Sequence, residues 1–519
     1  MDNANIQNGI NYGYTPQGIP NYVSTPLFYT VESQELLDFR EKMARKLGPA
    51  SLIYAVFSTF CLYKNLSGVT MPFFGIATLA FMIYGLKLYN VEIKRASWFY
   101  GSTLLALSIS NFLTGNHTIL FFNNVGIFFM LVVFLLHNVY DDSRWNFSKT
   151  TKAVFEAFFG SFGVLDDYLK DMKVLKIRRS STPEKTTRKT TIKFILIGLL
   201  ISIPLVSFLI VLLSGADAVF GNIFESLMLN CIVDFFLNFG NAIGVTITFI
   251  FIFFAAYCIM RFFSKKTINE EVVEKRNYEP IIAITVLSII SVVYLIFSVI
   301  QIVYLFIGGG ELPAGYTYAE YAREGFFELL TVAIINFLMV LFVNNRFRES
   351  RALKILMTVI SGCTYIMIAS SCMRMLLYID AYLLTSLRIL VLWGLAVLAL
   401  LFAAVIASIF KHDFPLFRYS IIVVSVMYMI LSFSHYDYII ADYNLSHIDY
   451  AETEEGSPRS FTDYDYLATL STDAAPVIAE YKDDWADGYF QRNRYHYEGR
   501  SWRQLNLSLY TAKELADYR

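Results

Sequence analysis

The sequence predicts an all-α polytopic transmembrane helical bundle of about eleven spans with a small, mainly helical extracytoplasmic C-terminal tail. Composition is the first observation: 56% of the 519 residues are apolar and 16% are charged, against roughly 45–50% and 25% in average soluble proteins. The apolar residues also form long continuous runs, unlike the short alternating segments of a membrane β-barrel. These features exclude a disordered chain, a nucleic-acid-binding protein and an ordinary soluble enzyme.

A polar leader and eleven apolar runs account for most of the chain. Residues 1–45 lack periodicity up to about residue 32, and a helix is expected to begin near Ser33 and to enter the first span. Spans 1–4 fall within residues 46–140, and spans 5–11 within residues 193–434. The expected spans are 48–64, 69–89, 97–114, 118–140, 193–214, 240–261, 280–307, 326–344, 354–374, 387–410 and 416–434.

Residues 141–192 form an insert with an amphipathic and then a basic part. Its apolar side chains recur at helical spacing, which indicates a helix with one apolar face. That helix either lies on the inner leaflet or packs beneath the bundle, and Gly160 and Gly163 are candidate breaks. The basic part is a candidate contact for anionic lipid through Lys176, Arg178 and Arg179, or an ordinary positive-inside anchor. The apolar stripe is Phe155, Phe158, Phe159, Phe162, Leu165, Leu169 and Met172.

The distribution of basic residues predicts the orientation. Lys and Arg concentrate in alternate loops, and the leader and the insert belong to the basic set. We therefore expect a multi-pass cell-membrane protein whose N-terminus is cytoplasmic and whose C-terminus is extracytoplasmic. The tail, residues 435–519, has twice as many acidic as basic residues and contains Trp485 and Trp502. Short helices are expected near 463–470, 474–490 and 508–518, leaning on the membrane face or on outer loops.

Ionisable residues near the membrane are the natural candidates for a site. They cluster at the expected outer ends of the spans, where opposite signs allow pairing. Three interpretations remain open: a structural salt-bridge network, a polar pocket for a small ligand or lipid head group, and a proton relay. Tyr316–Glu328 is expected to form an outer helix that docks on the span ends, with Arg323 paired to a nearby acid or to Asp380. The candidate residues are Asp217, Glu320, Arg323, Glu324, Glu328, Arg374, Asp380 and Arg388.

Catalytic and metal motifs are not found in the sequence. The six histidines show no ligand spacing, the five cysteines form no CxxC pair, and neither GxSxG nor a phosphate loop occurs. We therefore expect no metal, no cofactor and no enzymatic activity. Polar residues within spans are expected to serve as interhelical contacts. These residues are Asn111, Asn123, Asn124, Asn241 and Asn336.

Several segments resemble a known family. They include LSGADAVFG at 213–221, TYAEYAREGFFEL at 317–329, RMLLYIDAYLLTSLR at 374–388, ADYN at 441–444 and YLATLSTDAAP at 466–476. Over roughly residues 190–480 the chain resembles the bacterial membrane family called domain of unknown function 4173, which is related to family 4153. The resemblance implies a multi-helix inner-membrane bundle with an outer tail, and no activity.

The function expected from these features is that of a non-enzymatic envelope sensor or regulatory protein, with the lipid bilayer as its surroundings. The alternative is a transporter or lipid-handling protein with a site near the outer leaflet. A transporter requires polar residues near the bilayer centre, so the position and bonding of such residues discriminate between the two.

Overall fold

The structure, a computed structural model, describes residues 33–142, 145, 147–180, 218–271, 276–303, 318–411, 414–447, 464–497 and 501–518. These residues form helices and no strand, and a single isolated bridge joins Tyr278 and Phe347. Eight helices in the described part are long and apolar enough to cross a membrane. The expected all-α architecture is confirmed there, and it is compatible with a multi-pass membrane protein.

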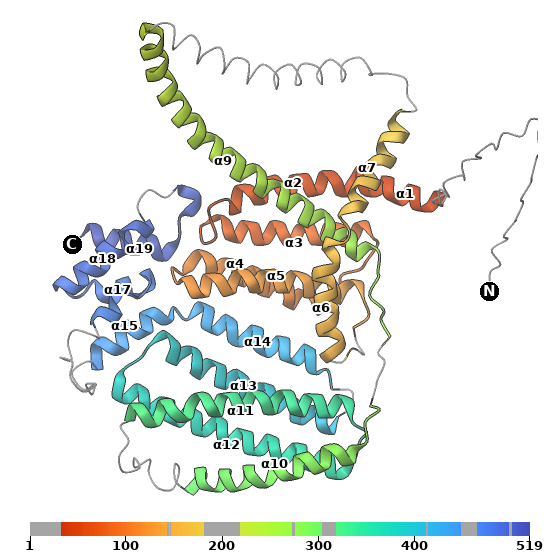
Figure 1. Cartoon of the computed structure of the whole chain (residues 1–519), viewed down its shortest axis with the longest axis vertical. Coiled ribbons are helices and arrows are strands. Elements are labelled where there is room, and N and C mark those ends of the chain that lie inside the picture. Colours follow the sequence, from red (N-terminus) through yellow and green to blue (C-terminus); the bar gives the residue numbers. More distant parts are fainter. Residues whose placement is uncertain are drawn as a thin grey trace, which may run out of the picture.

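The first half of the bundle starts as one continuous rod. Ser33 caps α1 by accepting a hydrogen bond from the Leu36 N–H, and α1 continues through a π-helical turn into α2. The next helices lie beside this rod, and α9 crosses them (Figure 1). The elements are α1 (Gln34–Lys42), the turn (Met43–Leu47), α2 (Gly48–Leu62), α3 (Thr70–Leu88), α4 (Ser97–Leu113), α5 (His117–Val139), α6 (Phe147–Phe162), α7 (Leu165–Ser180) and α9 (Ala218–Ser264).

The second half is a bundle of five helices in which α12 packs against α10, α11 and α13. Pro280 opens α10, where its missing N–H costs no hydrogen bond. α11 runs unbroken into its apolar part, because Gly325 alone does not stop a helix. The helix expected at Tyr316–Glu328 is therefore present from Tyr318 onward as the first part of α11, and its outer location stays a prediction. The elements are α10 (Pro280–Gln301), α11 (Tyr318–Arg346), α12 (Arg351–Tyr382), α13 (Ser386–Phe410) and α14 (Leu416–Phe433).

Most of the expected spans coincide with helices. Those at 48–64 and 97–114 correspond to α2 and α4, which have 15 and 17 residues. Both are shorter than the ~20 apolar residues that cross the hydrocarbon core of a bilayer, and neither is among the eight helices counted above. The span at 193–214 lies outside the described residues. The total of about eleven spans therefore stays a prediction.

The insert crosses the bundle at one end. α6 runs across α5, α9 and α14, in contact with each (Figure 1). It buries Thr150, Ala153 and Ala157 and leaves the predicted phenylalanine face exposed. Gly160 permits the close crossing, since a Cβ there would lie 2.4 Å from Phe262. The helix ends just before Gly163. One of its faces packs on the bundle, as one of the two expected arrangements requires, and its phenylalanine face is exposed, so contact of that face with the inner leaflet stays a prediction.

The C-terminal helices gather at the opposite end of the bundle, where the N-terminus of α5 also lies (Figure 1). We call α15 together with residues 464–518 the cap. The expected helix at 474–490 is divided in two, because the chain turns at residues 479–483. The elements of the cap are α15 (Tyr436–His447), a 3-10 turn (Thr472–Ala474), α17 (Ala475–Ile478), α18 (Asp484–Tyr497), a second 3-10 turn (Trp502–Gln504) and α19 (Leu507–Asp517).

Candidate functional site

The charged residues predicted as a site fall on the ends of α11, α12 and α13. Asp217 lies outside the described residues, and so do the side chains of Glu320, Arg323 and Glu324. Of the others, Glu328 and Asp380 are exposed, and Arg374 and Arg388 are half-buried. The pairing predicted for Arg323 is therefore untested.

Arg388 closes the turn between α12 and α13. Its Nη1 donates to the carbonyl oxygens of Tyr382 and Leu383, and its guanidinium lies 4.1 Å from the centroid of the Tyr378 ring. Leu383 has a φ of 64°, which is costly for a residue with a side chain. Asn444 of the cap bonds both backbone groups of the next residue. The contacts described for Arg388 thus stabilise a strained turn, whereas the sequence predicted a carboxylate partner.

A different polar site joins the cap to the bundle, and Asp473 is its main anchor. Asp473 is 6% exposed and accepts hydrogen bonds from Thr114 Oγ1 at 2.5 Å and from the Gly115 N–H at 2.7 Å. His435 Nδ1 lies 3.3 Å from its Oδ2. Burial alone would raise the pKa of Asp473, but the hydrogen bonds from His435, Gly115, Ser508 and Thr114 hold it below its usual value.

The α4–α5 loop has the shape that this contact requires. A Cβ at Gly115 would lie 2.0 Å from the Thr472 Oγ1, so only glycine lets the cap approach so closely. The next residue, Asn116, caps α5 by accepting from the Ile119 N–H. A short loop with Thr, Gly and Asn in sequence therefore holds the cap and starts α5.

A second contact attaches the end of the cap to the α2–α3 loop. Asn506 Nδ2 donates to the carbonyl oxygens of Ser67, Asn111 and Thr114 at 2.8–3.1 Å, while its Oδ1 caps α19. Asn65 Nδ2 donates to the Arg503 carbonyl at 3.0 Å. Buried backbone acceptors of both loops are thus satisfied by the cap, as buried polar groups must be.

A second buried carboxylate, that of Asp437, belongs to the first turn of α15. Its Oδ2 accepts from Asn116 Nδ2 at 2.8 Å and from the Ser471 N–H at 3.1 Å. Its Oδ1 is buried and has no hydrogen-bond partner within the described part of the chain. Burial raises the pKa of Asp437, and the hydrogen bonds from Ser471 and Asn116 only partly oppose this. Such an atom requires a proton or a ligand.

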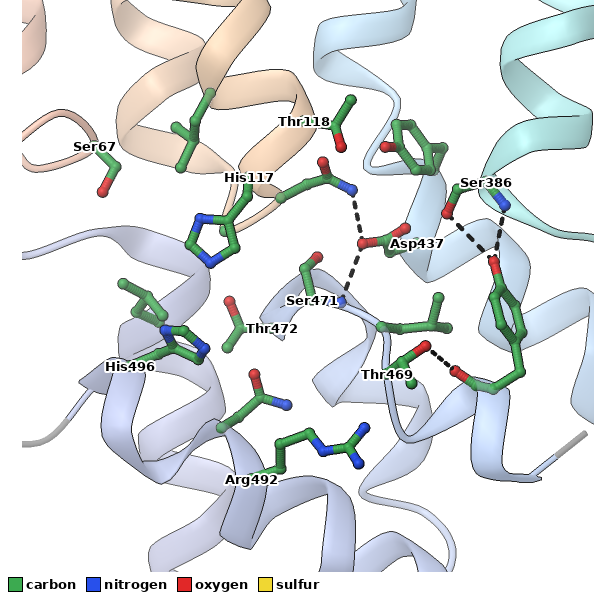
Figure 2. Close-up of a pocket in the computed structure, with 18 residues that line it drawn as sticks. Ser67, His117, Thr118, Ser386, Asp437, Thr469, Ser471, Thr472, Arg492 and His496 are labelled. Atoms are coloured by element: carbon green, nitrogen blue, oxygen red, sulfur yellow. Dashed lines mark hydrogen bonds between the residues drawn. The ribbon is translucent and has the colours of Figure 1, made fainter. Parts of the chain in front are cut away.

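Asp437 lines a cavity of about 270 Å³ between the cap and the bundle, which we call the junction pocket (Figure 2). Its walls come from the α4–α5 loop and the start of α5, from α15, and from α18 and residues 466–472. Basic side chains surround one part of it, hydroxyl groups and Asp437 another (Figure 2). His117 and His496 face each other with ring centroids 5.3 Å apart. The basic lining residues are His117, Arg492 and His496, and the hydroxyl-bearing ones include Ser386, Tyr436, Tyr466, Thr469, Ser471 and Thr472.

Buried polar side chains continue from the junction into the bundle. Asn123 Nδ2 donates to Ser110 Oγ at 3.1 Å, and its Oδ1 accepts from Ser432 Oγ at 2.8 Å and Tyr428 Oη at 2.9 Å. The predicted interhelical role of Asn123 is thereby confirmed. Asn336 plays the same part in the other half, accepting from Tyr294 and donating to Thr364. These groups satisfy one another, so they hold helices together.

The opposite end of the bundle contains a cluster of ion pairs around Asp171 of α7. Arg40 Nη1 lies 3.2 Å from its Oδ1, Arg261 Nε lies 3.0 Å from its Oδ2, and Tyr257 donates to the same oxygen at 2.7 Å. Asp171 is fully buried, at 0% exposure. The cluster ties α1, α7 and α9 together.

The predicted contact of Arg178 with anionic lipid competes with a contact inside the protein. Arg178 bonds Asp38 Oδ1 at 2.6 Å and also bonds Glu41, both on α1. Its charge is therefore already compensated. The Lys176 side chain is exposed and stays a candidate, and the Arg179 side chain lies outside the described part.

Comparison with known proteins places the chain in a family. The family described as domain of unknown function 4153 (DUF4153) matches residues 101–481, which is more than half of the chain. The chain belongs to DUF4153. This is the relative named beside family 4173 in the sequence prediction, whereas membership of family 4173 is not shown. The match also begins well before residue 190, so it includes α4, α5 and α6. No curated protein and no solved structure matches the chain.

The DUF4153 match covers most of the junction pocket, which the sequence did not predict as a site. Asp437 is absent from the predicted set of charged residues, and Asp473 appears only within a segment of the family resemblance, residues 466–476. The informative pattern was local: a Thr-Gly-Asn loop opening a long apolar helix, and a Ser-Thr-Asp turn in an otherwise polar tail. Neither segment predicts that the side chains of Thr114 and Asp473 form a hydrogen bond with each other.

Proposed function

We propose that this DUF4153 protein is an integral membrane sensor or regulatory protein without catalytic activity, in which the cap detects a small ligand at the extracytoplasmic end. The charge bias along the loops supports this orientation, with the N-terminus inside and the C-terminus outside. The acidic cap then faces outward, and α1, α6 and α7 face the cytoplasm.

The observation that carries the proposal is the path of α5. Its N-terminus lines the junction pocket and adjoins the loop held by Asp473. At its other end, His137 Nδ1 lies 2.8 Å from Asp142, which also bonds Arg418 at 2.6 Å, and α6 packs nearby. One rigid helix thus connects a ligand-sized cavity with the end that holds the insert.

Hydrogen exchange of the purified full-length protein tests this coupling. Asp473→Asn releases the strongest anchor of the cap. We expect faster exchange in the cap and also in α6 and α7, whereas Asp465→Asn, which changes an exposed carboxylate of the cap, should leave both regions unchanged. Faster exchange in the cap alone would remove the sensor proposal.

The orientation has its own test. A periplasmic-type alkaline phosphatase reporter fused after Arg519 should be active only when the C-terminus is outside. A cytoplasmic readout would reverse the assignment of the two ends, and the cap would then respond to a cytoplasmic ligand.

The alternative function is transport or lipid handling with a site near the outer leaflet. The polar side chains that lead from the junction towards Asn123 favour it, since a transport route needs polar groups within the membrane. These side chains bond one another, however, which favours a structural role for them and hence the sensor function. Uptake of a pocket ligand into proteoliposomes, lost in Asn123→Ala, would decide for transport.

A further inference from the structure

We infer that the junction pocket binds a small zwitterion, with an anionic group held by Arg492, His117 and His496 and an ammonium group held by Asp437. This inference deepens the proposed function and rests on it in treating the pocket as a ligand site. It follows from the separation of charge within the cavity, described below.

One part of the pocket is suited to an anion. Arg492 lines it, with one hydrogen bond of 3.3 Å to the Ala468 carbonyl, and most of its donors remain for other partners. His117 and His496 add imidazole rings to the same part of the lining. The pocket also includes the first residues of α5, a helix of 23 residues, whose N-terminal N–H groups favour negative charge.

The Asp437 side of the pocket is suited to a cation. The carboxylate is 3% exposed, and two N–H donors already fix its Oδ2. Its Oδ1 lacks a partner within the described residues, and a buried acceptor without a donor costs about 1–3 kcal/mol. A ligand ammonium supplies both the missing donor and the opposite charge. Burial raises the pKa of Asp437, and a ligand ammonium beside the carboxylate would oppose that rise.

The size of the cavity limits the ligand. A volume of about 270 Å³ lies near the lower end for small-molecule sites, so a lipid could insert only its head group. An amino acid, phosphoethanolamine and the head group of phosphatidylethanolamine share the required chemistry: an anion and an ammonium a few bonds apart. The walls between the two ends carry Ser, Thr and Tyr hydroxyls, which bond either group.

Calorimetric titration of the full-length protein in detergent tests the inference with three probes. Phosphoethanolamine carries both charges, inorganic phosphate only the anion, and ethanolamine only the cation. We expect phosphoethanolamine to bind at least tenfold more tightly than either single-charge probe. Equal affinity for phosphoethanolamine and phosphate, or no binding by any probe at millimolar concentration, would overturn the inference.

Two variants test which part of the pocket binds the anionic group of the ligand and which part binds its ammonium group. Arg492→Ala should weaken phosphoethanolamine and phosphate about tenfold each, whereas Asp437→Asn should weaken phosphoethanolamine and leave phosphate unchanged or tighter. Arg494→Ala, on the same helix and outside the pocket lining, is the matched control and should bind as the parent does. Because Arg492 is exposed, its variant keeps the test valid if Asp437→Asn fails to fold. Loss of phosphate binding in Asp437→Asn, or unchanged binding in Arg492→Ala, contradicts the assignment.

Two further experiments are needed. The first distinguishes a lipid head group from a free zwitterion, and the second tests the sensor function independently of the ligand class. In nanodiscs that contain phosphatidylethanolamine, a bound head group should block phosphoethanolamine, whereas phosphatidylglycerol nanodiscs should not. Block in the first case identifies the lipid, and unhindered binding in both identifies a free zwitterion. Hydrogen exchange at α7 that does not respond to a bound probe would overturn the sensor function and leave the ligand class standing.

Discussion

Both ends of the bundle bury carboxylates, but the groups that bond those carboxylates differ between the two ends. At the α1–α7 end, Asp171 is held by two guanidinium groups and a phenol. At the cap end, Asp473 is held mainly by a hydroxyl, a backbone N–H and a histidine, and Asp437 by an amide and a backbone N–H.

This difference separates a fixed end from an adjustable one. Buried ion pairs between Arg and Asp keep their charge throughout the physiological pH range and are costly to break. Neutral donors and histidine allow the charge of a carboxylate to change with pH or with a ligand. The cap end also has a cavity and an incompletely bonded acid, and we therefore place the site there.

The sharpest test of the fixed end is Asp171→Asn. The substitution leaves Arg40 and Arg261 buried with less compensating charge, and we expect a loss of about 3–5 kcal/mol in the free energy of unfolding. Denaturation in mixed micelles measures it. Asp166→Asn, one residue before Asp167 and paired with Lys170 on the surface, should cause no measurable loss. Similar values for the two variants would mean that the α1–α7 end is not a structural lock.

A smaller loss in the free energy of unfolding is expected from a substitution at the cap end. Asp473→Asn removes the charge from hydrogen bonds with Thr114, Gly115 and His435, and charge-assisted hydrogen bonds contribute about 2 kcal/mol. Limited proteolysis should cleave residues 464–518 faster, and denaturation in mixed micelles should show a loss of about this size in the free energy of unfolding. A loss as large as that of Asp171→Asn would erase the distinction between the two ends.

The polar contacts around Asn123, beneath the pocket, are expected to contribute less to stability than the contacts of Asp473. Asn123→Ala leaves Ser110, Ser432 and Tyr428 without a shared partner, and side-chain hydrogen bonds within membranes contribute about 0.6 kcal/mol and at most about 1.7. Thermal unfolding of the detergent-solubilised protein measures the effect. Asn336→Ala, the matched variant of the other half, should lower the midpoint by a similar amount. A much larger effect of Asn123→Ala would indicate that the junction depends on these contacts.

The helices were predictable because a spanning helix is encoded locally. An apolar run, a proline at the first turn as in α10, or an Asn cap as in α5 determines each element from a few neighbouring residues. The phenylalanine stripe of α6 and its break before Gly163 were predicted for the same reason. The helix expected at Tyr316–Glu328 is found from Tyr318 onward, but no local signal showed that it continues without a break into the rest of α11.

The candidate site could not be predicted from local sequence signals. Asp473 meets residues 114 and 115 across most of the chain, and local patterns do not encode that contact. Asp167 lies off the apolar stripe of the insert, as solvated acids do, yet it is 6% exposed and 2.5 Å from Lys265. Arg388 was expected to find a carboxylate, but backbone carbonyls satisfy a guanidinium equally well. The type of a charged residue predicts that it needs a partner, without saying which one.

The smallest expected effect is a pH dependence that belongs to the cap end alone. The hydrogen bond with Asp473 raises the pKa of His435 above 6.5, against burial, which lowers it. A raised pKa means that this stabilisation is complete below 6.5 and is lost as pH rises through the folded-state value. Asp437 acts in the same direction, because its pKa is also raised. The pKa of Asp473 is lowered from 3.8, so its own contribution is lost only in acid.

Hydrogen exchange at residues 464–497, corrected for the intrinsic rate, should therefore accelerate as the pH rises from 6 to 8, and by more than exchange at α6 and α7, which respond only through the coupling along α5. In His435→Gln the side-chain amide can still donate to Asp473 but does not titrate, so the acceleration in this pH range should disappear. A slope that survives unchanged in His435→Gln would show that His435 is not the group responsible for the pH response. An equal slope at both ends would mean that the adjustable end is not distinguished by its titrating groups.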